Sequence, residues 1–220
     1  MIKHHPKQAL LKTYIAGELP ASISVIIAAH IELCPHCQEQ VEMLTQQAAK
    51  ETFTSQCSTE AIDLDSIDID AMINNITLND DIEISEVPKA IEVELNNKQY
   101  FLPQVLRNLP QSNWAKLGKL SRSRITLEDD NLHTSLLHID AEGSVPAHTH
   151  NGFEITLLLE GSFKDEMGTY NQGDFIWLDG KHTHNPITES GCLCLTVSSD
   201  SLHFTQGISK LLNPIGKFIY

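Results

Sequence analysis

The pattern of hydrophobic positions changes about 90 residues into the chain. Before that point, apolar residues recur at spacings of three and four, which is typical of amphipathic helices. After it, short apolar or β-branched runs alternate with turn signals, which is typical of strands. The sequence therefore predicts an α+β protein in which a small helical module is followed by an all-β domain.

Four helices are predicted in the first part, at residues 6–16, 21–31, 35–49 and 63–76. Gly17 is a C-cap signal for the first helix, and Ser22 can cap the second. The fourth helix is indicated by apolar residues at i, i+3, i+4 and i+7. They are Ile69, Met72, Ile73 and Ile76. Two interpretations of this apolar face stay open: it packs inside the protein, or it binds a partner.

Strands are predicted at residues 91–95, 133–139, 154–159, 175–178 and 193–197. Turn signals such as Asn151-Gly152 and Asp179-Gly180 separate them, and many short strands of this kind indicate a sandwich or a barrel. We expect a helical domain over residues 1–80, an acidic linker over 81–90 and a β-domain over 91–220. Because the linker is acidic and carries few apolar residues, we expect it to transmit little rigid contact.

The chain is acidic, with a formal net charge of −14 over 220 residues. Residues 51–98 alone carry twelve acidic and two basic side chains. This charge argues against direct nucleic-acid binding and favours a partner with a basic surface. No apolar run approaches the roughly 18 residues needed to span a bilayer, and the N-terminal residues do not form a signal peptide. We therefore expect a cytoplasmic protein without membrane contact, and the five cysteines fit a reducing compartment.

Cys34 and Cys37 form a Cys-x-x-Cys pair, with His30 about one helical turn upstream. Two thiols at this spacing reach one ion, and the imidazole supplies a third ligand. Pro35 suits the first turn of a helix, where the helix N-terminus favours the thiolate form. The fourth ligand of a zinc site is expected to come from His5 or its neighbour His4. A metal would also help to stabilise a helical module with so small a core.

Two alternatives to a metal site stay open for this stretch. Cys-Pro-His-Cys also occurs in thioredoxin-fold oxidoreductases, but that fold needs a strand before the motif, and residues 21–31 favour a helix. The two cysteines could also simply be buried. His36 is expected to be a solvated helix residue rather than a ligand.

A second group of candidate ligands lies in the β-region. His148 and His150 are two residues apart on a predicted strand and so point to the same face, and Glu154 keeps that parity. A second hairpin could bring His184 across to them. Three imidazoles and one carboxylate suit zinc, iron, manganese or nickel. The alternative is a barrel whose histidines are merely buried or solvated.

This second group resembles the two motifs of the cupin family. The first motif runs from a glycine through His-x-His to a glutamate and another glycine. Its counterparts here are Gly143, His148, His150, Glu154 and Gly161. In the second motif, Asp179 and Lys181 replace a usual proline and glycine, and the alignment favours His184 over His182 as the metal ligand. The resemblance implies a jelly-roll β-barrel with a divalent metal.

The order of a zinc-binding helical module and a cupin resembles the ChrR-like anti-sigma factors. In the helical part the resemblance rests on residues 4–6, 14–20, His30, Cys34 and Cys37. It implies that His5 is the first zinc ligand and that zinc or another divalent metal occupies the cupin. It also implies a regulator, not an enzyme. The helical module would bind an extracytoplasmic-function sigma factor, and the cupin would sense singlet oxygen or organic hydroperoxides.

The alternative function is catalytic. A metal-dependent cupin with three histidines and one glutamate can be a dioxygenase, an isomerase or a hydrolase, with an open metal position for substrate. The zinc module would then be an appendage. The sequence makes no prediction about the oligomeric state.

Overall fold

The computed structural model describes residues 1–54, 68–78, 91–95, 98–129, 131–150, 152–200 and 202–204. The helices are α1 (Gln8–Ile15), α2 (Ala21–Leu33), α3 (Pro35–Thr54) and α4 (Ile69–Thr77), with a 3₁₀ helix η2 (Gln104–Leu106) before the barrel strands. The strands are β1 (Ile91–Leu95), β2 (Lys98–Leu102), β3 (Ala115–Leu117), β4 (Leu120–Ile125), β5 (His133–Ile139), β6 (His148–His150), β7 (Phe153–Lys164), β8 (Thr169–Asn171), β9 (Phe175–Asp179), β10 (Cys192–Ser198) and β11 (Leu202–Phe204). This order of helices and then strands confirms the predicted α+β architecture.

The strands form an antiparallel barrel of the cupin type. Within the described part of the chain, the main sheet has the order β3-β4-β5-β10-β7-β8, and β9 pairs with β7 beside this path. The β1–β2 hairpin and the β6–β11 pair are separate two-stranded sheets. Gly161 of β7, which pairs with Cys192 of β10, has a φ of +80°, and a Cβ there would lie 2.2 Å from the carbonyl oxygen of Gly191. A glycine is therefore required at this close approach of two backbones.

The predicted helix boundaries are partly confirmed. Gly17 has a φ of +71° after α1, as expected for a C-cap glycine. Ser22 is not the cap of α2, so this prediction is wrong: the helix begins at Ala21. The carboxylate of Asp129 accepts the Ala21 N–H at 3.1 Å and also accepts the Ser22 N–H. The cap is therefore supplied by the barrel, from more than 100 residues away.

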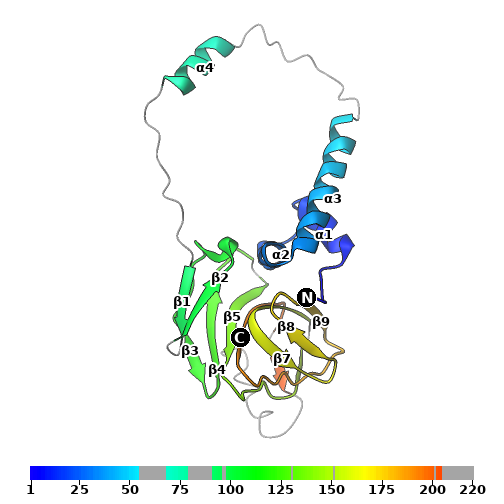
Figure 1. The fold of residues 1–220 in the computed structure, drawn as a ribbon, viewed down its shortest axis with the longest axis vertical. Helices are drawn as coiled ribbons and strands as arrows, with labels where there is room; N and C mark the ends of the chain where they lie inside the picture. Colours follow the sequence, from blue (N-terminus) through cyan, green and yellow to red (C-terminus); the bar gives the residue numbers. More distant parts are fainter. Residues whose placement is uncertain are drawn as a thin grey trace.

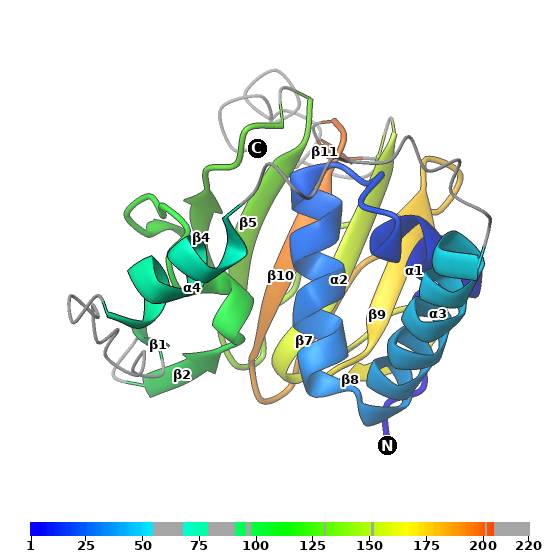
Figure 2. The same cartoon turned by 90° about the horizontal axis from the view of Figure 1, so that it is seen from above.

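The helical module lies directly on the barrel (Figure 1). Seen from above, α2 runs over β10 and β7, and α1 and α3 lie beside it (Figure 2). Ile26 and Ile27 of α2 belong to the same hydrophobic cluster as Leu136, Ile155 and Leu195 of the barrel. The linker was expected to transmit little contact, but here the two parts touch without using it. A second hydrophobic cluster lies inside the barrel and includes no helix residue among those described.

α4 lies away from the rest of the described structure (Figure 1). The Asp68 side chain caps it by accepting the Ala71 N–H at 2.9 Å. None of its residues is buried. The predicted residues 63–67 of this helix lie outside the described part. Within the described ranges, no helix combines the length and the apolar character needed to cross a membrane.

Candidate metal centres

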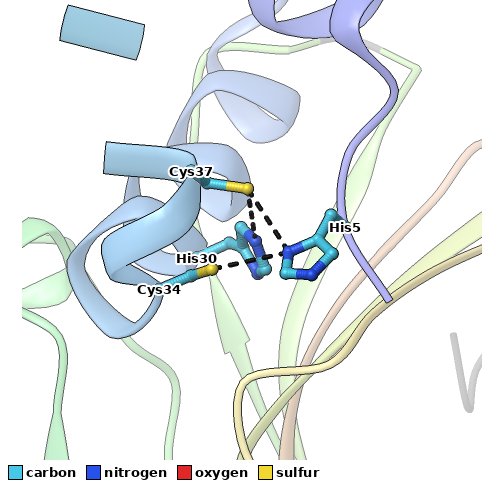
Figure 3. Close-up of side chains that lie close together, drawn as sticks. All are labelled: His5, His30, Cys34 and Cys37. Carbon is cyan, nitrogen blue, oxygen red and sulfur yellow. Dashed lines mark hydrogen bonds between the residues drawn. The ribbon is translucent and has the colours of Figure 1, made fainter. Parts of the chain in front are cut away.

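The first candidate centre is assembled from three segments of the helical module (Figure 3). His5 comes from the chain before α1, His30 from the last turn of α2, and the two cysteines from the junction with α3. Cys34 has an extended backbone, with φ −120° and ψ 98°, and Pro35 begins α3 as predicted, so Cys37 lies in its first turn. The spacing of the motif thus turns both sulfurs toward one point.

The ligand atoms of His5, His30, Cys34 and Cys37 lie within 4.8 Å of one another. His5 Nδ1 is 3.4 Å from the sulfur of each cysteine, and His30 Nε2 is 3.2 Å from the Cys37 sulfur. His4 does not join the group: it is exposed, and its ring packs against Tyr170 with the ring centroids 5.0 Å apart. Of the two predicted sources for a fourth ligand, the structure brings in His5.

The two histidines of this group are in the form that binds a metal. His30 Nδ1 lies 2.9 Å from the carbonyl oxygen of Gly173, which can only accept, so Nδ1 carries the proton and Nε2 keeps its lone pair. Burial lowers the pKa of His30 to about 4, and burial, with the charge of His36, lowers the pKa of His5. The thiolate expected from the helix N-terminus is not favoured at Cys37, because burial and the neighbouring Cys34 raise its pKa to about 12, and metal binding would have to displace this proton. Two thiolates and two neutral imidazoles can form a closed tetrahedral Cys₂His₂ set, the arrangement of structural zinc.

The second candidate centre lies in the barrel. His148 and His150 stand on β6 and Glu154 near the start of β7, so the predicted parity is kept across the turn. The backbones of His148 and His184 exchange two hydrogen bonds of 3.1 Å, which place His184 opposite β6. His182 is exposed and pairs with Asp179 at 2.7 Å, so the structure brings His184 into this centre and not His182.

The four side chains converge on one buried point, with ligand atoms within 4.8 Å of one another and no residue more than 4% exposed. One carboxylate oxygen of Glu154 lies 2.9 Å from His150 Nε2 and 3.7 Å from His184 Nε2. His148 Nδ1 lies 2.8 Å from the carbonyl oxygen of Pro146, so Nδ1 carries the proton and Nε2 is the nitrogen that can bind an ion. A buried carboxylate surrounded by imidazoles is costly unless it is paired or coordinates a metal, so these donors fit a divalent cation.

The charges of this centre also suit a metal. Burial raises the pKa of Glu154, but the three surrounding histidines, with His150 first among them, outweigh this and lower it to about 2. Burial and the neighbouring His148 lower the pKa of His184 to about 3. The site therefore presents a carboxylate and an imidazole that is neutral at pH 7, which is the form in which both bind metals.

Very little free space adjoins this second centre. The cavity beside its ligands has a volume of about 30 Å³. It is lined by Leu137, Ile139, Val145, His148, Glu154, Thr156, Phe163, His184, Pro186, Cys194 and Thr196. A space of this size holds about one water molecule.

Sequence reasoning missed the residues that support the ligands. The carbonyl groups of Pro146 and Gly173 each hold a histidine ring, and the Asp174 carboxylate binds the chain just before His5. Gly173 and Asp174 stand inside the second cupin motif, but only the packing of the helices on the barrel brings them to the first centre. No local pattern in the sequence could have indicated that contact.

The fold and the two centres define a class: cupin barrels preceded by a helical module that carries a Cys₂His₂ group. Residues 104–201 match the ChrR cupin-like domain family. The chain is 28% identical to the anti-sigma-E factor ChrR of Cereibacter sphaeroides over 215 residues, which are 97% of each protein. It is also similar to a chain in the crystal structure of Rhodobacter sphaeroides SigE in complex with the anti-sigma ChrR. The two share 26% identity with a TM-score of 0.66, over 90% of this chain and 100% of that one. The chain is therefore similar to ChrR along most of its length, in agreement with the resemblance seen in the sequence.

Proposed function

We propose that this protein is an anti-sigma factor. It binds an extracytoplasmic-function sigma factor in the cytoplasm and keeps it from RNA polymerase, and an oxidative signal received by the cupin releases it. The observation that carries the proposal is the similarity to anti-sigma ChrR over both the helical module and the barrel. The ligands of the proposed zinc site are His5, His30, Cys34 and Cys37. Those of the proposed cupin metal are His148, His150, Glu154 and His184.

The exposed apolar surface of the helices supports a protein partner. The buried face of α2 is already covered by the barrel, so it is not available for binding. A groove of about 200 Å³ runs between α1 and α3, and Met43 and Phe53 of α3 are 65% and 86% exposed. On α4, the apolar face predicted from the sequence is between 51% and 72% exposed. Exposed apolar side chains that cluster on one face of a helix are typical of an interaction surface.

The charge of the chain fits the same partner. Sigma factors carry basic surfaces where they face DNA, and an acidic protein with a net charge of −14 complements them. Repression by covering such a surface requires no catalysis.

The size of the barrel cavity argues against the enzyme alternative. Substrate pockets usually measure roughly 300–1,000 Å³, whereas the space beside the cupin ligands is about 30 Å³. Four protein ligands also fill a tetrahedral zinc site, whereas a catalytic zinc keeps an open position. Such a centre suits a sensor, because a small reactive species fits beside its ligands and a larger substrate does not.

The proposal is tested by co-expression with the extracytoplasmic-function sigma factors of the same organism, beginning with any that is encoded beside this gene. Full-length protein should copurify with one of these sigma factors in a one-to-one complex and should suppress transcription from its promoter. An unrelated sigma factor of the same class serves as the control. If none of these sigma factors associates with the protein, and the metal-loaded protein instead turns over a substrate, the anti-sigma proposal is contradicted.

A further inference from the structure

The first metal centre touches the barrel through the turn between β8 and β9. The chain that carries His5 to this centre, residues 2–5, is here called the N-terminal arm. The buried carboxylate of Asp174 accepts the backbone N–H groups of Lys3 at 2.7 Å and His4 at 3.0 Å. The Phe175 N–H donates to the His4 carbonyl at 3.0 Å. Three hydrogen bonds thus fix the backbone just before His5.

The same turn holds the arm by close packing. Gly173 has a φ of +87°, and a Cβ at this position would lie 2.3 Å from the Cδ1 atom of Ile2. The arm therefore lies against the bare backbone of the turn, where no other residue fits. The Gly173 carbonyl also accepts the hydrogen bond from His30 Nδ1. Two of the four candidate ligands are consequently positioned by contacts with the cupin.

We propose that the β8–β9 turn of the cupin completes the metal site of the helical module: Asp174 positions the arm that carries His5, and Gly173 orients His30. This inference rests on the proposed function, because it assumes that the Cys₂His₂ group binds zinc. Hydrogen-bond partners that orient metal ligands typically change metal affinity by about 10–100-fold when they are lost. The helical module should therefore hold its metal more tightly when these contacts with the barrel are made.

This contact also gives the two centres a short connection. β9 begins at Phe175, directly after the turn, and pairs with β7, where Leu178 stands opposite the cupin ligand Glu154. The chain then continues from β9 to His184. A shift of β9 at the cupin centre would consequently move the turn that holds the zinc site, which provides a route from the sensor to the helices.

The test uses full-length protein loaded with Co²⁺ in place of zinc. Of the two ligand groups only the first contains cysteine, but Cys194 lines the cavity beside the second. All forms therefore carry Cys194→Ser, so that the thiolate-to-cobalt charge-transfer absorption reports on the first centre. In Asp174→Ala, the Co²⁺ dissociation constant from this absorption should rise at least about tenfold. Asp129→Ala is the matched control. Asp129 also accepts two backbone N–H groups from the helical module, but it does so at the start of α2 and away from the metal. The control should change the constant by less than about twofold.

Asp174 also accepts the N–H of Asn171 within its own turn, at 2.8 Å, so its loss could disturb the barrel. Ile2→Ala loosens the arm from outside the barrel and should also weaken cobalt binding at the sulfur centre, while binding at the cupin centre is kept. The inference would be overturned if Ile2→Ala left the cobalt affinity of the first centre unchanged. It would also be overturned if Asp174→Ala and Asp129→Ala lowered that affinity equally. Absence of the thiolate absorption in wild-type protein would instead overturn the proposed zinc site, and the inference with it. The measurement needs no sigma factor, so failure to bind one leaves its result unchanged.

Discussion

At the scale of single residues, each candidate centre contains a histidine in which a backbone carbonyl holds one ring nitrogen and so determines which nitrogen can bind a metal. The Gly173 carbonyl does this for His30, and the Pro146 carbonyl does it for His148. Ligand types and spacing could be predicted from the sequence because Cys-x-x-Cys and His-x-His are local patterns. The carbonyl partners could not, because any residue presents a carbonyl and only the fold decides which one faces a ring.

His5 and His4 provide a matched pair for testing the first centre. His5→Ala should lower the metal content of the purified protein by about one ion per chain, because it removes a ligand from the Cys₂His₂ set. His4→Ala should keep the metal, since this side chain packs on Tyr170. Metal analysis of the two variants gives the answer. Loss of metal in His4→Ala, with normal metal content in His5→Ala, would show that His4 and not His5 is the ligand.

His184 and His182 provide the same comparison in the cupin. His184→Ala should remove the barrel metal, and His182→Ala should not, because His182 is exposed and paired with Asp179. The expected contents are about one metal ion per chain in the first variant and about two in the second, measured by elemental analysis. The reverse pattern would contradict the alignment of the second cupin motif.

At the scale of elements, the central feature is α2, which is held on the barrel at both ends. Asp129 caps its first turn, and the carboxylate of Glu32 in its last turn accepts the N–H of Gln104 at 2.7 Å. Between these points, Ile26 and Ile27 are completely buried. The helical module and the barrel therefore share a core, and we expect them to unfold together.

Ile27→Ala tests this shared core. The substitution should lower the free energy of unfolding by about 2–5 kcal/mol, since it leaves a cavity among closely packed side chains. In a chemical denaturation experiment, the spectroscopic signal of the helices and that of the barrel should be lost in the same transition. Met43→Ala on the exposed side of α3 is the control and should change stability by less than about 0.5 kcal/mol. Separate transitions of helices and barrel would argue for independent domains.

The structure also shows where sequence patterns stop being informative. Periodicity predicted α1 to α3 and most long strands, such as β7, whose buried positions carry mainly apolar residues. It missed β4, whose inward positions include Ser121 and Ser123 while arginines stand between them. The Ser22 cap was wrong because Asp129, remote in sequence, occupies that role. In both cases tertiary contacts decide what a local pattern cannot.

The apolar face of α4 offers a test of partner binding that is independent of folding. Ile73→Asp places a charge in the centre of this exposed face and should weaken binding of the sigma factor at least about tenfold. Stability should hardly change, because the side chain is 51% exposed. Asn75→Asp adds the same charge outside the apolar face and serves as the control. Equal affinities of both variants, measured by titration calorimetry, would exclude α4 from the interface.

At the scale of the whole molecule, the two proposed metal sites are joined by β9 and the turn that precedes it. The first is completed by the turn that begins β9, and the second lies where β9 passes Glu154 and leads on to His184. A change at the proposed cupin metal would therefore act on β9, and the turn before β9 holds the proposed zinc site of the helices. This arrangement suits a protein in which sensing and inhibition belong to different parts and must be connected.

The most direct test of this account is a reporter for the sigma-dependent promoter, in cells that carry wild-type protein or the His148→Ala/His150→Ala double variant. Wild-type protein should repress the reporter, and singlet oxygen or an organic hydroperoxide should relieve the repression. The double variant, confirmed as folded and present at the same level, should repress equally but remain unresponsive, because the helical surface is intact and the sensor is lost. Relief of repression by oxidant in the double variant would contradict the account, since the signal would then enter elsewhere than at the cupin metal.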